Sequence, residues 1–138
     1  MKWIHRTELG THITDLGILV WRVGLSVSMI YGHGAGKLFG YGELAAGFRD
    51  PLGLGPGVTL MLAILAEFFC SILVALGLVT RLALIPLIST MAVAALIVHG
   101  ADPYGRKELA LVYLVSYLAL WAIGPGRLSL DEKLKRRR

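Results

Sequence analysis

Long apolar stretches separated by short polar segments dominate this chain. A soluble helix would show polar positions at helical period, and several of these stretches have almost none. Four windows carry few or no charges: Leu16–Phe39, Gly57–Val79, Leu82–Val98 and Leu109–Gly124. About 20 consecutive apolar residues cross the bilayer core as a helix. The pattern therefore predicts an all-α fold, a transmembrane four-helix bundle with spans at about 16–39, 57–79, 81–100 and 108–124.

The composition agrees with a single membrane domain. The 138 residues are 56% hydrophobic and only 17% charged, more apolar than an ordinary soluble domain. A chain of this length suits one domain. Residues 1–138 are therefore expected to form one membrane domain that ends in a basic tail at 127–138.

Lysine and arginine are distributed unevenly between the two ends of the predicted spans. If both termini are cytoplasmic, nine of the 14 basic residues lie inside and three outside, as the positive-inside rule requires. The nine are Lys2, Arg6, Arg81, Arg127, Lys133, Lys135, Arg136, Arg137 and Arg138, and the three are Arg49, Arg106 and Lys107. The tail is therefore expected to lie near anionic lipid, with no nucleic acid as a partner.

The first predicted span is rich in glycine. Gly36-Lys37 resembles the end of a phosphate-binding loop, but Leu38 stands where that loop needs serine or threonine. Small residues instead recur every four positions, at Gly24, Ser28, Gly32, Gly36 and Gly40. Such a stripe lets another helix approach closely. It predicts packing against a neighbouring helix or against a second copy of the chain.

A second face of the same span carries basic side chains. Arg22, His33 and Lys37 are spaced so that they share one side of a helix. Polar side chains in a span should face the protein interior, and Glu67 is the only acid in the four windows. If the cytoplasmic ends of the first two spans are level, Glu67 lies between Arg22 and His33 in depth, and both are open as its partners.

Two interpretations of these polar side chains remain. In the first, Arg22 and Glu67 form a structural ion pair that joins the first two spans. In the second, a ligand site occupies the outer half of the bundle, because histidine and glutamate there can exchange a proton with a bound quinone or polar headgroup. The residues expected to line that site are His33, Lys37, Glu67, His99 and Tyr113.

Other chemistry is poorly supplied. Cys70 is the only cysteine, so no intrachain disulfide or CxxC pair is expected. The four histidines, His5, His12, His33 and His99, lack metal-ligand spacing, and no metal site is predicted. No cofactor motif is evident, which leaves a bound quinone as the open possibility. Between the first two spans, a Gly/Pro-rich loop of 17 residues is expected to fold as a lid or re-entrant segment.

Several segments together resemble the DoxX family. They are Arg22 early in the first span, then "HGAGKLFG", "AEFFCSILVALGLVTRLA" and "GPGRLSLDE", in order between about residues 16 and 132. The resemblance implies a four-helix inner-membrane protein of bacteria or archaea. Some relatives are named as subunits of a thiosulfate:quinone oxidoreductase, and others are linked to complexes that handle thiols and oxidative stress. The positions that match the family's recurring polar residues are Arg22, His33, Lys37, Glu67 and Arg81.

Three functions are consistent with these observations. The first is a membrane subunit or partner of a quinone-linked oxidoreductase, with quinone near His33, Lys37 and Glu67. The second is a small proton-coupled transporter that depends on Glu67. The third is a non-catalytic membrane scaffold, in which Arg22 and Glu67 fix the helix register.

Overall fold

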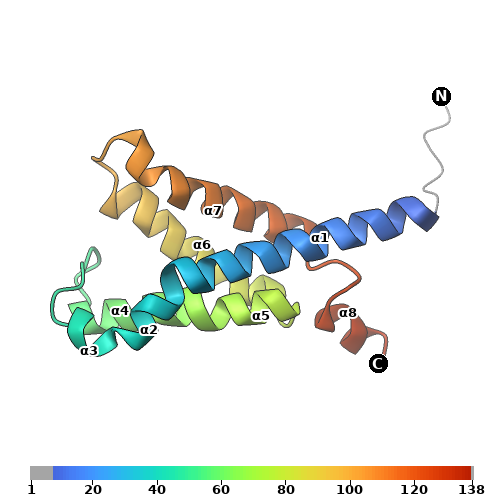
Figure 1. The fold of residues 1–138 in the computed structure, drawn as a ribbon, viewed down its shortest axis with the longest axis horizontal. Coiled ribbons are helices and arrows are strands. Elements are labelled where there is room, and N and C mark those ends of the chain that lie inside the picture. Colours follow the sequence, from blue (N-terminus) through green and yellow to red (C-terminus); the bar gives the residue numbers. More distant parts are fainter. Residues whose placement is uncertain (1–7, 138) are drawn as a thin grey trace.

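Regular structure is helical throughout the part of the chain that the computed structural model describes, residues 8–137 (Figure 1). The expected all-α fold is confirmed for this range. Four of the residues discussed above, Lys2, His5, Arg6 and Arg138, lie outside it. The helices are α1 (Glu8–Met29), η1 (Ile30–Gly34), α2 (Ala35–Phe39), α3 (Tyr41–Leu44), α4 (Pro56–Ile64), η2 (Leu65–Cys70), α5 (Ser71–Leu76), α6 (Thr80–Val93), η3 (Ala94–Val98), α7 (Tyr104–Ile123) and α8 (Leu130–Lys135).

These segments join into longer rods, because each of the π-helical segments η1, η2 and η3 continues the α-helix before it without a break. The α1 helix packs along α5, η1 lies against η2, and α6 packs against η2 and α7. Figure 1 shows α7 and α6 diverging from the α1–η1–α2 rod toward one end of the molecule. We call this end, with the loop 45–55 and the turn 99–103, the loop end, and the opposite end the α8 end.

Two rods approach each other very closely at Gly34. A Cβ atom placed there would lie 2.8 Å from the carbonyl carbon and oxygen of Glu67. Only glycine permits two backbones to come this close. Gly34 therefore fixes the level at which η1 and η2 meet, and it brings the backbone of Glu67 next to the first rod.

Three segments that are distant in sequence meet at the α8 end. Arg22 Nη1 donates a hydrogen bond to the carbonyl of Val74 at 3.1 Å, and Nη2 donates to the carbonyl of Leu128 at 2.9 Å. Arg22 is only 1% exposed. Gly77 ends α5 in the left-handed conformation, and a side chain there would overlap the guanidinium. Arg22 thus ties α1 to α5 and to the segment before α8.

Asp131 completes this contact, which we call the α8 junction (Arg22, Gly77, Thr80 and Asp131). Its carboxylate accepts hydrogen bonds from the amides of Val79 and Thr80 and from the Thr80 hydroxyl, at 2.7–2.9 Å. These bonds cap α6 and hold Val79 at φ 44°, which a β-branched residue rarely adopts. Burial raises the pKa of Asp131, but the hydrogen bonds from Thr80 and Val79 outweigh burial and hold that pKa below its ordinary value.

The outer surface of the rods is apolar, as a membrane protein requires. Large hydrophobic side chains on all four rods are more than half exposed, among them Phe39, Met61, Leu82, Leu96 and Val115. Among the described residues, three stretches can cross a membrane by length and composition: Gly10–Phe39, Pro56–Leu76 and Thr80–Val98. This confirms a membrane protein with several apolar helices.

The fourth predicted span, α7, does not meet the same test within the described residues. Arg106, Lys107 and Glu108 fall within its first five residues, which leaves fifteen without charge. Fifteen residues span roughly 22 Å as a helix, less than the bilayer core of about 30 Å. The fourth crossing and the cytoplasmic position of both termini therefore stay predictions.

Candidate functional site

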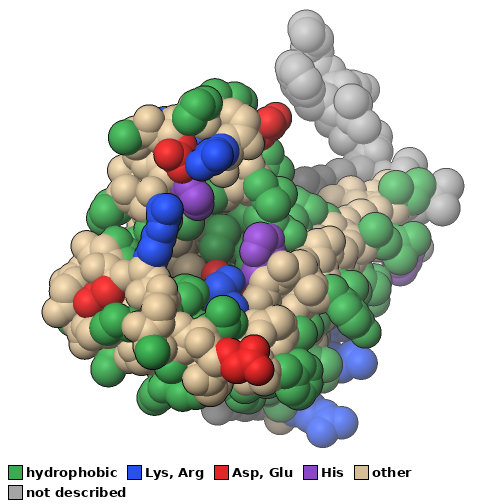
Figure 2. Space-filling view, turned by 60° about the vertical axis from the view of Figure 1, so that its left-hand side comes forward, with side chains coloured by type: hydrophobic (Ala, Val, Ile, Leu, Met, Phe, Trp, Pro, Cys, Tyr) green, Lys and Arg blue, Asp and Glu red, His purple; other side chains and the backbone are tan. Residues whose placement is uncertain are grey.

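A cavity of about 830 Å³ opens at the loop end, between the rods where they diverge. Figure 2 shows the hollow, with histidine side chains on two of its sides and basic side chains at its edge and inside it. The five side chains expected to form a ligand site all line this one cavity: His33, Lys37, Glu67, His99 and Tyr113. They come from four separate helical rods, so the fold brings together what the sequence keeps apart.

Each π-helical segment contributes to the cavity wall or ends at a residue that does. His33 lies in η1, Glu67 lies in η2, and His99 directly follows η3. A π turn adds one residue to a helical turn and rotates the next part of the helix about its axis, and such turns are frequent at functional sites. The three π segments therefore aim the two histidines and the glutamate at a common space.

The centre of the polar wall is an ion pair. Lys37 Nζ lies 2.5 Å from Glu67 Oε2, and the two side chains are 20% and 6% exposed. Lys37 stands one turn beyond Gly34, whose close approach brings the Glu67 backbone within reach. Because each charge meets its opposite inside the cavity, this wall presents little net charge to a ligand.

The expected ion pair between Arg22 and Glu67 is wrong. Arg22 is engaged with backbone carbonyls at the α8 end, and Glu67 is engaged with Lys37. The error came from treating the ends of the first two rods as level. On that assumption Gly34 would lie six residues, roughly 9 Å, above Glu67, whereas their backbones touch. Figure 1 shows the cause, since α1 projects well beyond the end of α5.

Aromatic rings connect the cavity to the core. The His33 ring meets the Tyr113 ring edge-on, with centroids 6.0 Å apart, and Tyr113 stacks on Tyr117 at 5.8 Å. Tyr113 is nearly buried and Tyr117 fully buried. These contacts fix the orientation of the His33 ring, whose nitrogen atoms make no hydrogen bond or ion pair among the described residues. His33 is therefore available to bind a ligand.

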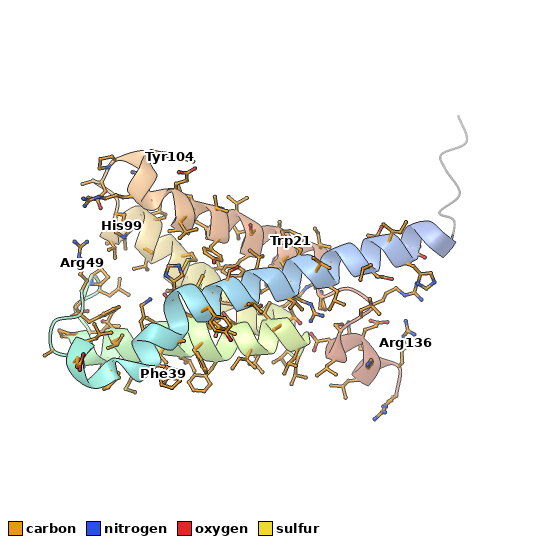
Figure 3. All side chains as sticks on the ribbon, in the orientation of Figure 1. Trp21, Phe39, Arg49, His99, Tyr104 and Arg136 are labelled. Atoms are coloured by element: carbon orange, nitrogen blue, oxygen red, sulfur yellow. The ribbon has the colours of Figure 1, made fainter. Side chains whose placement is uncertain are left out.

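A second group of charged residues surrounds the mouth of the cavity. His99 Nδ1 lies 2.8 Å from Asp102 Oδ2, and the hydrogen bond with His99 is the main reason that the pKa of Asp102 lies below its ordinary value. Arg49 Nη1 donates to the Val98 carbonyl at 3.3 Å. Figure 3 shows Arg49 pointing from its loop toward the turn that carries His99. We call Arg49, His99, Asp102 and Arg106 the mouth cluster.

The loop 45–55 forms one side of the cavity, and its action as a lid stays a prediction. Asp50 organises it, because its carboxylate accepts hydrogen bonds from the amides of Leu54 and Gly55 and from the Thr59 hydroxyl, at 2.7–3.0 Å. These bonds, that from Thr59 first, hold the pKa of Asp50 below its ordinary value. They also tie the loop to the first turn of α4 through the Thr59 side chain. Phe48 and Leu52 of this loop line the cavity.

The glycine stripe does not pack within this chain. A Cβ atom placed on Gly24, Gly32 or Gly36 would have no neighbour within 4 Å. A Cβ atom on Gly40 would lie closest to Gly36 and Leu44, which belong to the same part of the chain. Ser28 is exposed too, although its side chain lies within hydrogen-bonding reach of Tyr113. The glycines of the stripe face away from the neighbouring rods, and the close approach falls on Gly34 instead. Contact of the stripe with a second copy of the chain stays a prediction.

Sequence reasoning missed four residues that position the helices and loops: Gly34, Asp50, Ser129 and Asp131. Gly34 lies off the four-residue stripe, and its only signal is its place beside His33 on the inward face. The capping role of Ser129 is signalled by Ser-x-x-Glu in "SLDE", and its hydroxyl accepts from the Glu132 amide at 3.3 Å. For Asp50 and Asp131, the only signal in the sequence is their position in or shortly after a segment rich in glycine and proline.

Together, the apolar exterior, the all-helical rods and the cavity with its polar wall define a small helical membrane protein. The family described as DoxX matches residues 17–100. The chain belongs to the DoxX family. No curated protein and no solved structure matches the chain. The matched range includes Arg22, His33, Lys37, Glu67 and His99, but not the Tyr113 side of the cavity.

Proposed function

We propose that this protein is the membrane subunit or membrane partner of a quinone-linked oxidoreductase of the thiosulfate- or thiol-oxidising type, and that its cavity binds the quinone. The observation that carries the proposal is the meeting of His33, Lys37, Glu67, His99 and Tyr113 around one largely apolar cavity. A quinone needs an apolar site for its tail and a few hydrogen-bonding groups for its ring. Membership of the DoxX family supports the same assignment.

The side chains divide into binding and proton-exchanging groups. His33 has no hydrogen-bond partner among the described residues and would donate to a ring carbonyl. Lys37 would donate to the same oxygen with another of its three hydrogens while staying paired with Glu67. A quinone bound here would supply the acceptor for two electrons and two protons. His33 and Glu67 are the side chains placed to pass protons to it.

The orientation in the membrane follows from the same proposal. With the termini in the cytoplasm of a bacterium or archaeon, the loop end faces outward across the plasma membrane. The cavity mouth then lies at the outer boundary of the bilayer, where a partner subunit that oxidises a sulfur compound can approach it. Electrons would reach the quinone from that partner.

Binding of a photoreactive quinone tests the proposal directly. The purified protein is placed in nanodiscs of phosphatidylcholine and irradiated with an azido-quinone, and the labelled peptides are identified by mass spectrometry. We expect label in the segments that contain His33 and Tyr113, reduced about tenfold in His33→Phe because its ring hydrogen bond is lost. Lys133→Gln, which removes an exposed charge from α8, serves as the control. Label spread evenly over the apolar exterior would rule out the quinone site.

A proton-coupled transporter is the second candidate. The observation in its favour is that the cavity opens at the loop end while Arg22 and its carbonyl partners close the α8 end, as in one state of a transporter. Flux in proteoliposomes under a proton gradient, lost in Glu67→Gln, would favour this function over quinone binding.

A further inference from the structure

The charges at the mouth of the cavity differ from those deeper inside it. Deep in the cavity, Lys37 and Glu67 neutralise each other. At the mouth, neither Arg49 nor Arg106 lies within 4 Å of an acid, counting the described residues. Both arginines act on Asp102 through their charge, and this one carboxylate is also hydrogen-bonded to His99 at 2.8 Å. The mouth cluster therefore carries more positive than negative charge, and neither arginine is held in a close ion pair.

Arginine is the side chain best suited to hold an acidic group, because its planar guanidinium makes paired hydrogen bonds to a carboxylate or phosphate. Arg49 comes from the loop 45–55, and Arg106 comes from the first turn of α7. Both line the cavity. Two arginines from separate segments that converge on one opening form a clamp more readily than a diffuse basic surface does.

The wall between the mouth and the deep polar groups is hydrophobic. It is formed by side chains from α3, from the loop 45–55 and from three of the four rods, including Leu44, Phe48, Leu62, Leu65, Met91 and Leu109. A ligand that satisfies both regions has an apolar body and an acidic head. A molecule without the acid leaves the arginines unpaired, and a small anion without an apolar body leaves the wall exposed to water.

From this distribution we infer that the cavity takes an anionic amphiphile, whose carboxylate or phosphate head binds between Arg49 and Arg106 and whose apolar body lies along the hydrophobic wall. The quinone proposal depends on the deep residues and does not use these two arginines. A free long-chain carboxylic acid and an anionic phospholipid supply the same chemistry. The two sources are separated by the test.

The test uses photoreactive amphiphiles on the intact protein in phosphatidylcholine nanodiscs. Diazirine-bearing hexadecanoate is compared with the matching hexadecanol, and diazirine-bearing phosphatidylglycerol with the matching phosphatidylcholine. We expect one or both acidic probes to label the loop 45–55 and the start of α7 about tenfold more than the neutral counterpart. Preference for hexadecanoate identifies a free acid, and preference for phosphatidylglycerol identifies a lipid.

Variants at the mouth decide whether the arginines are responsible. Arg49→Gln and Arg106→Gln should reduce labelling by the acidic probe to the level of the neutral one, whereas Arg49→Lys should retain part of the preference. Lys133→Gln, far away on α8, should label like the unmodified protein. Thermal melting of each variant shows that the fold is intact.

Equal labelling by acidic and neutral probes overturns the inference, and so does an acid preference that survives both glutamine substitutions. The azido-quinone is tested on the same Arg49→Gln and Arg106→Gln samples. Quinone label that persists while the acid preference is absent would overturn the anionic ligand alone. Loss of quinone label in His33→Phe with an intact acid preference leaves both proposals standing.

Discussion

At the scale of single residues, the Lys37–Glu67 pair is the contact on which the cavity depends. Both groups are largely removed from solvent, so each needs the other. Removing one partner of a buried pair leaves an uncompensated charge, whereas removing both costs much less. We expect Lys37→Met to lower the free energy of unfolding by about 3 kcal/mol, and Lys37→Met with Glu67→Gln to recover most of this loss.

Thermal melting of the purified single and double variants in detergent measures this coupling. Lys107→Met is the matched control, because Lys107 donates only to the exposed Gly100 carbonyl. If the single and double variants melt at the same temperature, the pair contributes nothing to the fold.

Gly34 provides a sharper test of the geometry. A methyl group at this position meets backbone atoms of Glu67, which cannot rotate away as a side chain can. We expect Gly34→Ala to cost about 1–3 kcal/mol. Gly36→Ala adds its methyl to open space, so it should be neutral or raise stability by up to about 1 kcal/mol through helix propensity. The comparison is made by thermal melting, and equal effects would contradict the Gly34–Glu67 contact.

That these polar residues gather in one place could be predicted from the sequence, but their pairing could not. A lone glutamate and several bases in apolar windows must turn inward on physical grounds, which was enough to select Lys37, Glu67 and the two histidines. Choosing Arg22 as the partner required the relative height of two helices. That height is set by one glycine contact at Gly34, which no periodicity reveals.

At the scale of elements, the π turns explain the remaining difference. Helical wheels assume 3.6 residues per turn, and η1, η2 and η3 break this assumption near the cavity. Helix existence could be read from the apolar windows, since length and composition decide it. The local rotation introduced by a π turn depends on tertiary packing. The exact direction in which Lys37 and His99 face could therefore not be predicted from the apolar windows.

The α8 junction makes the stability of the contact between α6 and α8 depend on pH. The pKa of Asp131 is depressed in the folded protein, so its contribution to stability is present above the unfolded pKa, near 4, and is lost as pH falls through the lower folded value. We expect Asp131→Asn to lower stability at neutral pH by about 1 kcal/mol, and to flatten the dependence of stability on pH below about 4.

Thermal melting between pH 3 and 7 measures both effects. Glu132→Gln removes the adjacent charge, which contacts only the exposed Arg136, and should leave the pH profile unchanged. An unaltered profile in Asp131→Asn would show that the acid does not hold α6 and α8 together.

The loop 45–55 is a second element whose conformation depends on one carboxylate, that of Asp50. Asp50→Asn weakens the hydrogen bonds to Leu54, Gly55 and Thr59. We expect hydrogen exchange of residues 50–57 to accelerate, while that of α7 stays as it is. Thr59→Val, which removes one of the three bonds, should give a smaller change, and Glu43→Gln should give none. Uniform exchange in all variants would mean that the loop is held by its apolar contacts alone.

At the scale of the whole molecule, the arrangement combines an apolar exterior, a closed α8 end and an open loop end. Hydrophobic side chains exposed on all four rods form the surface that meets lipid. The α8 junction joins the ends of the rods through buried hydrogen bonds, so the rods can diverge at the other end and leave room for a ligand. The cavity at the loop end thus depends on the contacts that hold the rods together at the α8 end.

The path of the chain across the bilayer is the last property that this arrangement predicts. If α7 crosses the membrane despite its short uncharged stretch, the turn 99–103 and α8 lie on opposite sides. Single cysteines at Gly47, Ala101 and Lys133, all exposed, in a Cys70→Ala background report the side of each. A membrane-impermeant maleimide added to intact cells should label positions 47 and 101, and it should label position 133 only after permeabilisation. Labelling of all three in intact cells would mean that α7 lies along the membrane surface. Its charged residues Arg106, Lys107 and Glu108 would then remain in water. The cavity would in that case open into the aqueous phase instead of beside lipid.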